Sequence, residues 1–144
     1  MSKDVKELEE NLKAYIGGYP NTYTYTKSLA EKQLMKTHEN VKLVIWRPSI
    51  IASAVGDPFP GWTDTLSAAG GLGLLACLGL MQNVRVEEDG ETAFDMVPVD
   101  FVSNGCLVAT AYSAVNNIDF NIYNMATSVK NKITFAGFRE IGIR

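Results

Sequence analysis

The feature that most constrains the fold is the alternation of helical and extended patterns along the chain. Residues 4–15 place apolar side chains three and four positions apart, and residues 23–36 contain neither proline nor glycine, so both segments are predicted helices. Residues 41–46 are rich in β-branched and aromatic side chains and predict a buried strand that ends at Arg47-Pro48. Because strands that alternate with helices favour a parallel arrangement, we expect an α/β fold with a parallel sheet.

The rest of the chain continues this alternation. The predicted elements are strands at 92–99 and 121–125, a helix at 100–114 and a closing helix at 133–141. Asp100 and Thr134 stand at the starts of the two helices, where an oxygen side chain can cap the first backbone N–H groups. Prolines and a glycine predict a loop at 57–61. No repeat and no linker composition interrupts the chain, so residues 1–144 are expected to form a single domain.

The most apolar segment, residues 68–81, contains four glycines. It is shorter than the roughly 20 residues that a membrane-crossing helix requires. We therefore expect a helix, broken by glycine, that packs in the core or lines a pocket. Contact of this segment with a membrane surface is an alternative that the sequence leaves open.

A complete dinucleotide-binding fold opens with a strand, a glycine-rich turn and a helix, and this chain shows no such opening. Gly70-Gly71-Leu72-Gly73 supplies glycines, but it lacks the preceding strand and the acidic residue of that motif. The expected architecture is therefore a partial Rossmann-like parallel sheet without the N-terminal glycine-rich βαβ unit.

The charge balance and the rare ligand residues exclude several functions. Thirteen basic and sixteen acidic residues give a net charge of -3, which offers no positive surface for nucleic acid and no polybasic face for anionic lipid. Cys77 and Cys106 lie among apolar neighbours and are expected to be reduced, packed thiols. His38, the only histidine, lies among polar residues and is expected to be solvated, so we expect no metal site. The N-terminal residues show no apolar run of a secretory signal.

Tyr23 and Lys27 are the strongest candidates for chemistry. Residues four apart share a helix face, so the phenol and the ammonium are expected to project together. A phenol with a reference pKa near 10 transfers protons poorly at neutral pH, and a fixed ammonium nearby stabilises the phenolate form. This spacing also occurs by chance in roughly one protein in four of this length, so a surface pair without function is the alternative.

Several segments around and after this pair occur in a characteristic order. They are residues 19–31, 44–51, 57–64, 95–100 and 122–125, which read YPNTYTYTKSLAE, VIWRPSII, DPFPGWTD, DMVPVD and IYNM. In content and approximate spacing, these segments resemble the fatty acyl-CoA reductases of the extended short-chain dehydrogenase/reductase superfamily. The resemblance covers about residues 8–140 and corresponds to the second half of the reductase's Rossmann-like domain.

The resemblance implies a reaction and a set of site residues. Members of this family reduce a fatty acyl-CoA to the aldehyde and then to the fatty alcohol, with hydride from NADPH. By this resemblance Tyr23 is the general acid, while Lys27 assists it and holds the ribose hydroxyls of the nicotinamide nucleotide. Pro48, Ser49 and Ile50 correspond to the loop that packs near the nicotinamide, at the carboxyl end of a strand. An ordinary turn at the end of a strand is the alternative for this loop.

The resemblance also implies how the acyl-CoA is bound. Trp62, Leu72 and Leu75 are candidates for an acyl channel, since a long alkyl chain gains about 0.8 kcal/mol for each buried CH2 group. Packing in the protein core is the equal alternative. The family often has basic residues where this chain has Ala76-Cys77, so no contact with the CoA phosphates is expected there. The implied location is intracellular, at the peroxisomal or endoplasmic reticulum membrane.

The family's glycine-rich phosphate loop, its adenosine-binding strand and its carbonyl-binding serine belong upstream of the Tyr/Lys helix, and this chain contains none of them. We therefore expect a fragment of a reductase with little activity as an isolated chain. Two other functions compete with this interpretation. One is a non-catalytic remnant that binds a partner or a lipid through an exposed sheet edge. The other is a different extended reductase or a sugar-nucleotide epimerase, against which the Pro-Gly-Trp and Val-Pro-Val-Asp segments argue.

Overall fold

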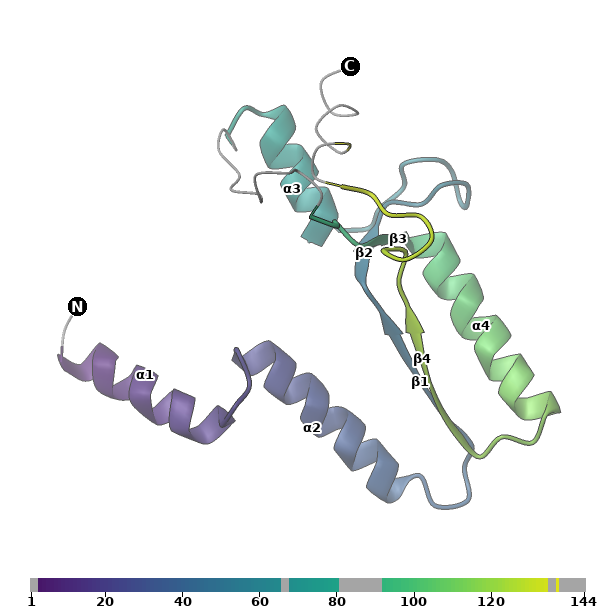
Figure 1. Ribbon diagram of the computed structural model, residues 1–144, viewed down its shortest axis with the longest axis horizontal. Coiled ribbons are helices and arrows are strands. Elements are labelled where there is room, and N and C mark those ends of the chain that lie inside the picture. The colour runs from purple at the N-terminus through teal and green to yellow at the C-terminus, as the bar shows by residue number, and fades with distance from the viewer. Residues whose placement is uncertain (1–2, 66–67, 81–91, 135–136, 138–144) are drawn as a thin grey trace. The chain divides into compact units, whose positions relative to one another are not determined.

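The computed structural model describes residues 3–65, 68–80, 92–134 and 137 of the chain (Figure 1). The chain divides into two compact units, residues 1–43 and 44–144, which we describe separately. Helices and strands follow one another along the described residues. The predicted α/β class is confirmed.

The first unit contains two helices. They are α1 (Lys3–Ile16) and α2 (Thr22–Thr37), each one residue longer at both ends than predicted. Gly17 ends α1 in the left-handed region at a φ of 62, and its N–H donates to the Lys13 carbonyl at 3.1 Å. Asn21 caps α2, because its side-chain oxygen accepts a hydrogen bond from the Thr24 N–H at 2.9 Å.

Aromatic rings connect the two helices of the first unit. Tyr25 on α2 meets Tyr15 on α1 edge to face, with ring centroids 5.7 Å apart. It meets Tyr19, in the connecting segment, in the same way at 5.5 Å. Ile16 is buried at the end of α1. These contacts hold the turn between the helices and therefore fix where α2 begins.

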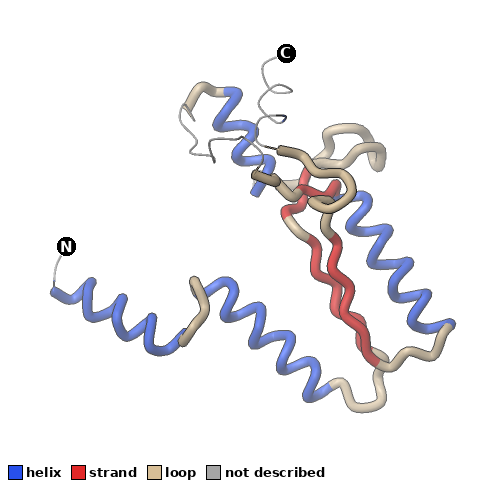
Figure 2. Tube along the Cα trace, in the orientation of Figure 1, coloured by secondary structure: helices blue, strands red, loops and turns tan. Residues whose placement is uncertain are grey.

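Two short sheets form the centre of the second unit (Figures 1 and 2). Their strands are β1 (Leu43–Pro48) with β4 (Phe120–Met125), and β2 (Ile50–Ala52) with β3 (Met96–Pro98). β2 and β3 are parallel, with Ile50 opposite Met96 and Ile51 opposite Val97. β1 and β4 also run in the same direction (Figure 1). The predicted parallel arrangement is confirmed.

The strands differ in extent from the sequence prediction. β1 begins at Leu43 and includes Pro48, so it is displaced two residues along the chain from the predicted strand. The strand predicted at 92–99 is reduced to β3, and Ala93 instead forms an isolated antiparallel bridge with Thr134. β2 was not predicted, because three residues are too few to show a periodic pattern.

Helix α4 (Val99–Val115) packs against β4 and against the β2–β3 pair (Figure 2). Gly105 faces the Trp46 ring so closely that a Cβ at this position would lie 2.7 Å from the ring carbon Cζ2. About two turns of the helix further on, the buried Ser113 hydroxyl lies 3.3 Å from the Tyr123 hydroxyl. The apolar core of the second unit contains Ile45, Ala54, Phe94, Val97 and Ala109.

Helix α3 (Ala68–Cys77) occupies most of the apolar segment, and its internal glycines do not break it. Gly79 ends the helical segment instead, at a φ of 69, and the next N–H, that of Leu80, donates to the Leu75 carbonyl at 3.0 Å. Across the described ranges, no helix combines the length and the apolar character needed to cross a membrane. Most of the predicted helix at 133–141 lies outside the described residues, although Thr134 Oγ1 accepts the capping bond from the Gly137 N–H at 3.1 Å.

Candidate active site

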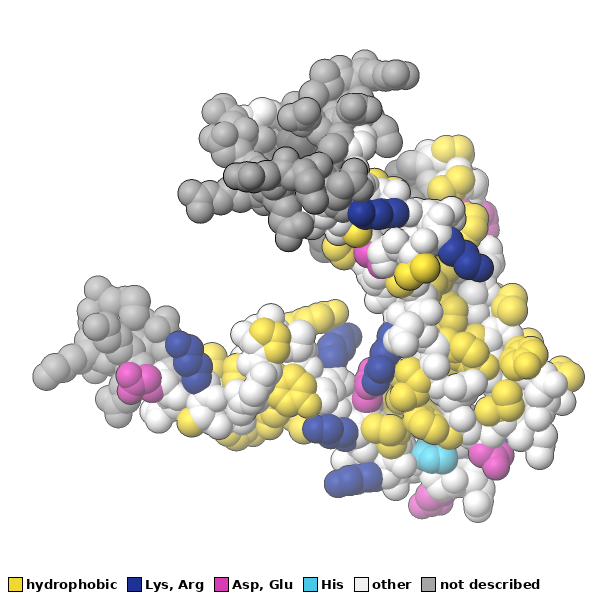
Figure 3. All heavy atoms as spheres, in the orientation of Figure 1, with side chains coloured by type: hydrophobic (Ala, Val, Ile, Leu, Met, Phe, Trp, Pro, Cys, Tyr) yellow, Lys and Arg dark blue, Asp and Glu magenta, His cyan; other side chains and the backbone are white. Residues whose placement is uncertain are grey.

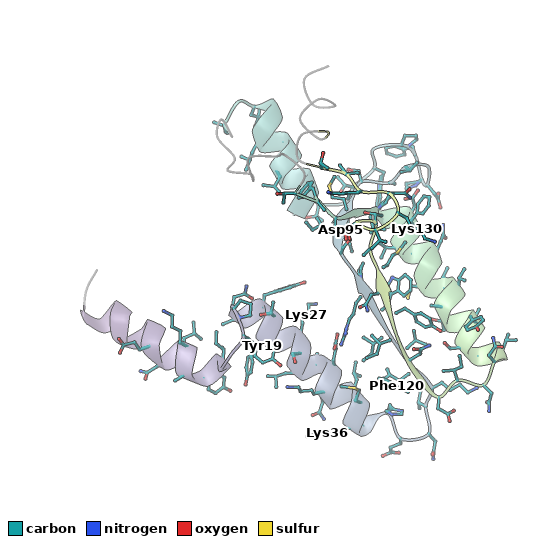
Figure 4. The ribbon with its side chains drawn as sticks, in the orientation of Figure 1. Tyr19, Lys27, Lys36, Asp95, Phe120 and Lys130 are labelled. Carbon is teal, nitrogen blue, oxygen red and sulfur yellow. The ribbon has the colours of Figure 1, made fainter. Side chains whose placement is uncertain are left out.

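Tyr23 and Lys27 lie one turn apart near the start of α2. The Tyr23 side chain is 67% exposed, and Lys27 Nζ lies 5.5 Å from the centroid of its ring. This distance is within the range of a cation–π contact, so the ammonium lies beside the phenol. The two side chains therefore form one donor pair on a face of α2 that a ligand can reach; Figure 4 labels Lys27.

A second group of tyrosine and lysine joins α2 to the segment that precedes it. The Tyr19 hydroxyl lies 2.6 Å from the Ser28 hydroxyl and accepts a hydrogen bond from Lys32 Nζ at 3.2 Å (Figure 4). The hydrogen bonds with Ser28 and Lys32 lower the pKa of the Tyr19 phenol. Sequence reasoning missed this group, because Tyr19 precedes the helix. Only the spacing of Ser28 and Lys32, four residues apart, could have indicated a shared polar face.

Pro48, Ser49 and Ile50 connect β1 to β2 at the carboxyl end of β1. The Ser49 N–H donates to the Met125 carbonyl at 2.9 Å, and the Ile50 N–H donates to the Asp95 carbonyl at 3.2 Å. The segment is thus bonded to the end of β4 on one side and to the residue before β3 on the other. Its backbone is held at the point where the chain passes from one sheet to the other.

The Asp95 carboxylate is a polar centre at this end of the sheets (Figure 4). Its Oδ1 atom accepts hydrogen bonds from the Ser49 hydroxyl at 2.9 Å, the Thr127 N–H at 2.8 Å and the Thr127 hydroxyl at 3.0 Å. The Thr127 N–H, and then the side chains of Ser128, Ser49 and Thr127, hold the pKa of Asp95 well below its usual range despite partial desolvation. Sequence reasoning gave Asp95 no such role, because its partners are distant in the chain.

Asp100 does not cap α4 as predicted. The N-cap position belongs to Pro98, and Asp100 lies in the first helical turn. Its carboxylate instead accepts hydrogen bonds from the backbone N–H groups of residues 55–57 at 2.9 to 3.3 Å. Desolvation raises the pKa of Asp100, but these backbone donors outweigh it and the net pKa is lowered. Asp100 is therefore the anchor of the loop that leads to Trp62.

The three candidates for acyl binding all belong to the second unit. Trp62 is partly buried at the end of a closed loop, where its carbonyl accepts a hydrogen bond from the Ala54 N–H at 2.9 Å. Leu72 and Leu75 lie one turn apart on α3 and are 39% and 43% exposed. The two leucines thus present an apolar surface rather than a buried core.

Two of the rare residues differ from their expected environments. Cys106 is a free thiol that is exposed on α4 rather than packed, and the Cys77 side chain is not among those described. His38 is partly buried at the C-cap of α2, where Nδ1–H donates to the Val41 carbonyl at 2.9 Å. Within the part of the chain that the structure describes, no group of three His, Cys, Asp or Glu residues could hold a metal ion.

Comparisons with known proteins give a consistent match. Residues 1–106 match the model of an NAD-binding family described as "Male sterility protein". The chain is 37% identical over 138 residues to a probable fatty acyl-CoA reductase 5 of Arabidopsis thaliana, covering 92% of this chain and 26% of that protein. It is 41% and 38% identical over 117 residues to the fatty acyl-CoA reductases 1 of Gallus gallus and Homo sapiens, covering 81% of this chain and 22% of each relative. The chain thus spans about a quarter of the length of the curated relatives that it matches.

Proposed function

Because this chain belongs to the male sterility protein family of NAD-binding domains, we propose that it forms the Tyr/Lys part of an NADPH-dependent fatty acyl-CoA reductase. The observation that carries the proposal is the donor pair of α2, with Lys27 Nζ 5.5 Å from the centroid of the Tyr23 ring. The pair lies within the segment that the family model matches. The substrate class comes from the names of the relatives, which are fatty acyl-CoA reductases.

The proposed reaction converts one fatty acyl-CoA, two NADPH and two protons into a fatty alcohol, CoA and two NADP+. Bound NADPH would supply the hydride for each reduction: a first hydride to the acyl carbon, from which CoA would leave as the thiolate to give the aldehyde, and a second, from another NADPH, to the aldehyde carbon. The Tyr23 hydroxyl donates its proton to the aldehyde oxygen in the second reduction. The Lys27 ammonium stabilises the resulting phenolate until water returns the proton, while the CoA thiolate takes its proton from water.

The donors of this chain fit a nicotinamide nucleotide. The Tyr23 hydroxyl and the Lys27 ammonium can both donate hydrogen bonds to ribose hydroxyl oxygens. The segment Pro48–Ile50 lies at the carboxyl end of β1, which is where open α/β sheets bind their ligands. The negative charge of Asp95 beside this segment is already met by three hydrogen-bond donors, so it is compatible with a neighbouring cofactor.

We place the acyl chain of the substrate against the apolar surface of Leu72 and Leu75, with Trp62 as a further contact. Each CH2 group that becomes buried contributes about 0.8 kcal/mol, so a long chain would bind firmly to such a surface. The exposure of both leucines supports this proposal, because their surface is still available to a ligand. The proposed location is the peroxisomal or endoplasmic reticulum membrane, in keeping with the apolar substrate.

A non-catalytic binding module is the second candidate function. Hydrophobic side chains gather over α4 (Figure 3). On this helix, Phe101, Val108, Tyr112 and Val115 recur at helical spacing and are all exposed. A stripe of this kind favours contact with another apolar surface. This candidate predicts that the chain binds neither NADPH nor acyl-CoA.

The first measurement is a titration of the full chain with NADPH and with NADH, in which the fluorescence of the reduced nicotinamide reports binding. The second measurement is the oxidation of NADPH that depends on palmitoyl-CoA. Tyr23→Phe should lower turnover by about 100- to 10 000-fold, because it removes the proton donor. It should weaken NADPH binding much less, because it removes one hydrogen bond to the ribose and leaves that of Lys27. NADPH is expected to bind more tightly than NADH.

Tyr112→Phe is the matched control, because Tyr112 is also an exposed tyrosine on a helix. It should change neither binding nor turnover. If the unaltered chain shows neither NADPH binding nor turnover, the reductase proposal is refuted for this chain and the binding module is favoured. Equal turnover of Tyr23→Phe and the unaltered chain would exclude Tyr23 as the acid.

A further inference from the structure

Resting on the function proposed above, we propose that Asp95 is a positioning residue that holds Pro48–Ile50 in the conformation that receives the nicotinamide. Asp95 bonds to two successive residues of this segment. Its Oδ1 atom accepts the Ser49 hydroxyl at 2.9 Å, and its carbonyl accepts the Ile50 N–H at 3.2 Å. The side chain and the backbone of one residue thus fix both the rotamer of Ser49 and the path of the chain into β2.

Thr127 connects this contact to the segment that follows β4. Its N–H and its hydroxyl reach the same Asp95 Oδ1 atom at 2.8 and 3.0 Å, and the hydroxyl also lies 3.0 Å from the Met96 carbonyl. The Ser49 N–H bonds to the Met125 carbonyl at 2.9 Å. Three chain segments therefore meet at one carboxylate, and we call Asp95 with Ser49 and Thr127 the Asp95 anchor.

The arrangement indicates positioning rather than direct binding of the cofactor. Three donors converge on Oδ1, so that atom is engaged within the protein rather than directed to a ligand. The neighbouring ladder is weak, because β2 and β3 pair over only three residues each. Without the anchor, the turn from β1 to β2 would depend on few bonds, and the segment would sample other conformations.

A segment that is ordered in advance binds its ligand more tightly, because less ordering remains to be done on binding. Asp95→Asn keeps Oδ1 as an acceptor but removes its charge and replaces Oδ2 by an NH2 group, so the three hydrogen bonds of the anchor become weaker. If the segment then holds the competent conformation one tenth of the time, the Kd for NADPH rises about tenfold. Thr127→Val should have a smaller effect in the same direction, and Thr127→Ser, which keeps the hydroxyl, should restore the original Kd.

Two measurements on the full chain test the inference. Amide hydrogen exchange without cofactor should become faster at residues 49–51 and 127–128 in Asp95→Asn, while exchange in α4 stays unchanged. Fluorescence titration with NADPH should show the higher Kd. Asp119→Asn is the matched control, because Asp119 is an exposed aspartate just before β4, and it should change neither readout.

The outcomes separate the two proposals. If the unaltered chain does not bind NADPH, the proposed function fails, and the cofactor role of Asp95 fails with it. If the unaltered chain binds NADPH but Asp95→Asn binds it equally well, or exchanges no faster at residues 49–51, only the role of Asp95 is refuted. Should Asp95→Asn fail to fold, the comparison of Thr127→Val with Thr127→Ser decides, and equal Kd values for these two variants would overturn the inference.

Discussion

The Tyr19 hydroxyl shows what a single residue contributes to the candidate active site. It joins Ser28 and Lys32, one turn apart on α2, to the segment that precedes the helix. Lys32 Nζ also lies 5.7 Å from the centroid of the Tyr19 ring. Tyr23 lies in the first turn of α2, four residues after Tyr19. The hydrogen bonds of Tyr19 therefore hold the start of the helix that carries the donor pair.

The lowered pKa of Tyr19 leads to a prediction for alkaline titration. A tyrosine whose folded pKa is lowered ionises at lower pH, so the phenolate absorbance of the unaltered chain should begin to rise earlier than that of Tyr19→Phe. Lys32→Met should shift this first rise to higher pH, because it removes a hydrogen bond to the phenolate and a nearby positive charge. Near-ultraviolet absorbance measures both. Tyr112→Phe is the control, and an identical start for Tyr19→Phe and the unaltered chain would contradict the prediction.

Helix α4 packs closely against strand β1 at one position. Its central glycine, Gly105, lets the helix backbone approach the Trp46 ring on β1. Tryptophan is a common strand residue, whereas glycine lowers helix propensity. The close approach explains why the helix tolerates a glycine at this position.

Gly105→Ala should destabilise the second unit although alanine favours helices. The added Cβ would lie 2.7 Å from a ring carbon of Trp46, and overpacking of this kind typically costs about 1 to 3 kcal/mol. Gly73→Ala on α3 is the matched control, because its Cβ would meet nothing within 4 Å. It should raise the free energy of unfolding by up to about 1 kcal/mol. Urea unfolding measures both changes, and a neutral or stabilising Gly105→Ala would show that α4 can move away from β1.

For the whole molecule, acid stability depends on carboxylates that tie distant segments together. The folded pKa of Asp95 is lowered, so its contribution is present above the ordinary aspartate pKa of about 4 and is lost as the pH falls through the folded value. Asp100 acts in the same direction, because its folded pKa is also lowered. The free energy of unfolding should therefore fall on acidification as these two carboxylates become protonated.

Asp95→Asn should make stability less dependent on pH. Near neutral pH we expect it to lower the free energy of unfolding by about 1 to 2 kcal/mol, because the donors of the anchor lose a charged acceptor that is only partly shielded from water. Below about pH 4 the difference from the unaltered chain should shrink, since protonation weakens the same bonds there. Urea midpoints across this pH range measure the effect, with Asp119→Asn as the control. A difference that stays constant with pH would refute the link to ionisation.

The extents of α1, α2 and α4 could be predicted within one residue, because helix periodicity, proline and glycine act on neighbouring residues. The same local rules placed Tyr23 and Lys27 on one helix face. They could not find β2, which is too short to show a pattern and exists only because β3 pairs with it. They also assigned Asp100 to a helix cap. In the structure its carboxylate instead accepts hydrogen bonds from a loop 43 to 45 residues away.

Side chains a few residues apart are sufficient to specify the class of fold, the order of the main elements and the donor pair of α2. The meeting of polar groups across the second unit depends instead on tertiary packing. Asp95 finds Ser49 at a separation of 46 residues and Thr127 at 32 residues, and no local pattern signals either contact. Such contacts form when strands come side by side, so their specificity lies in the packing of the sheets rather than in any one segment.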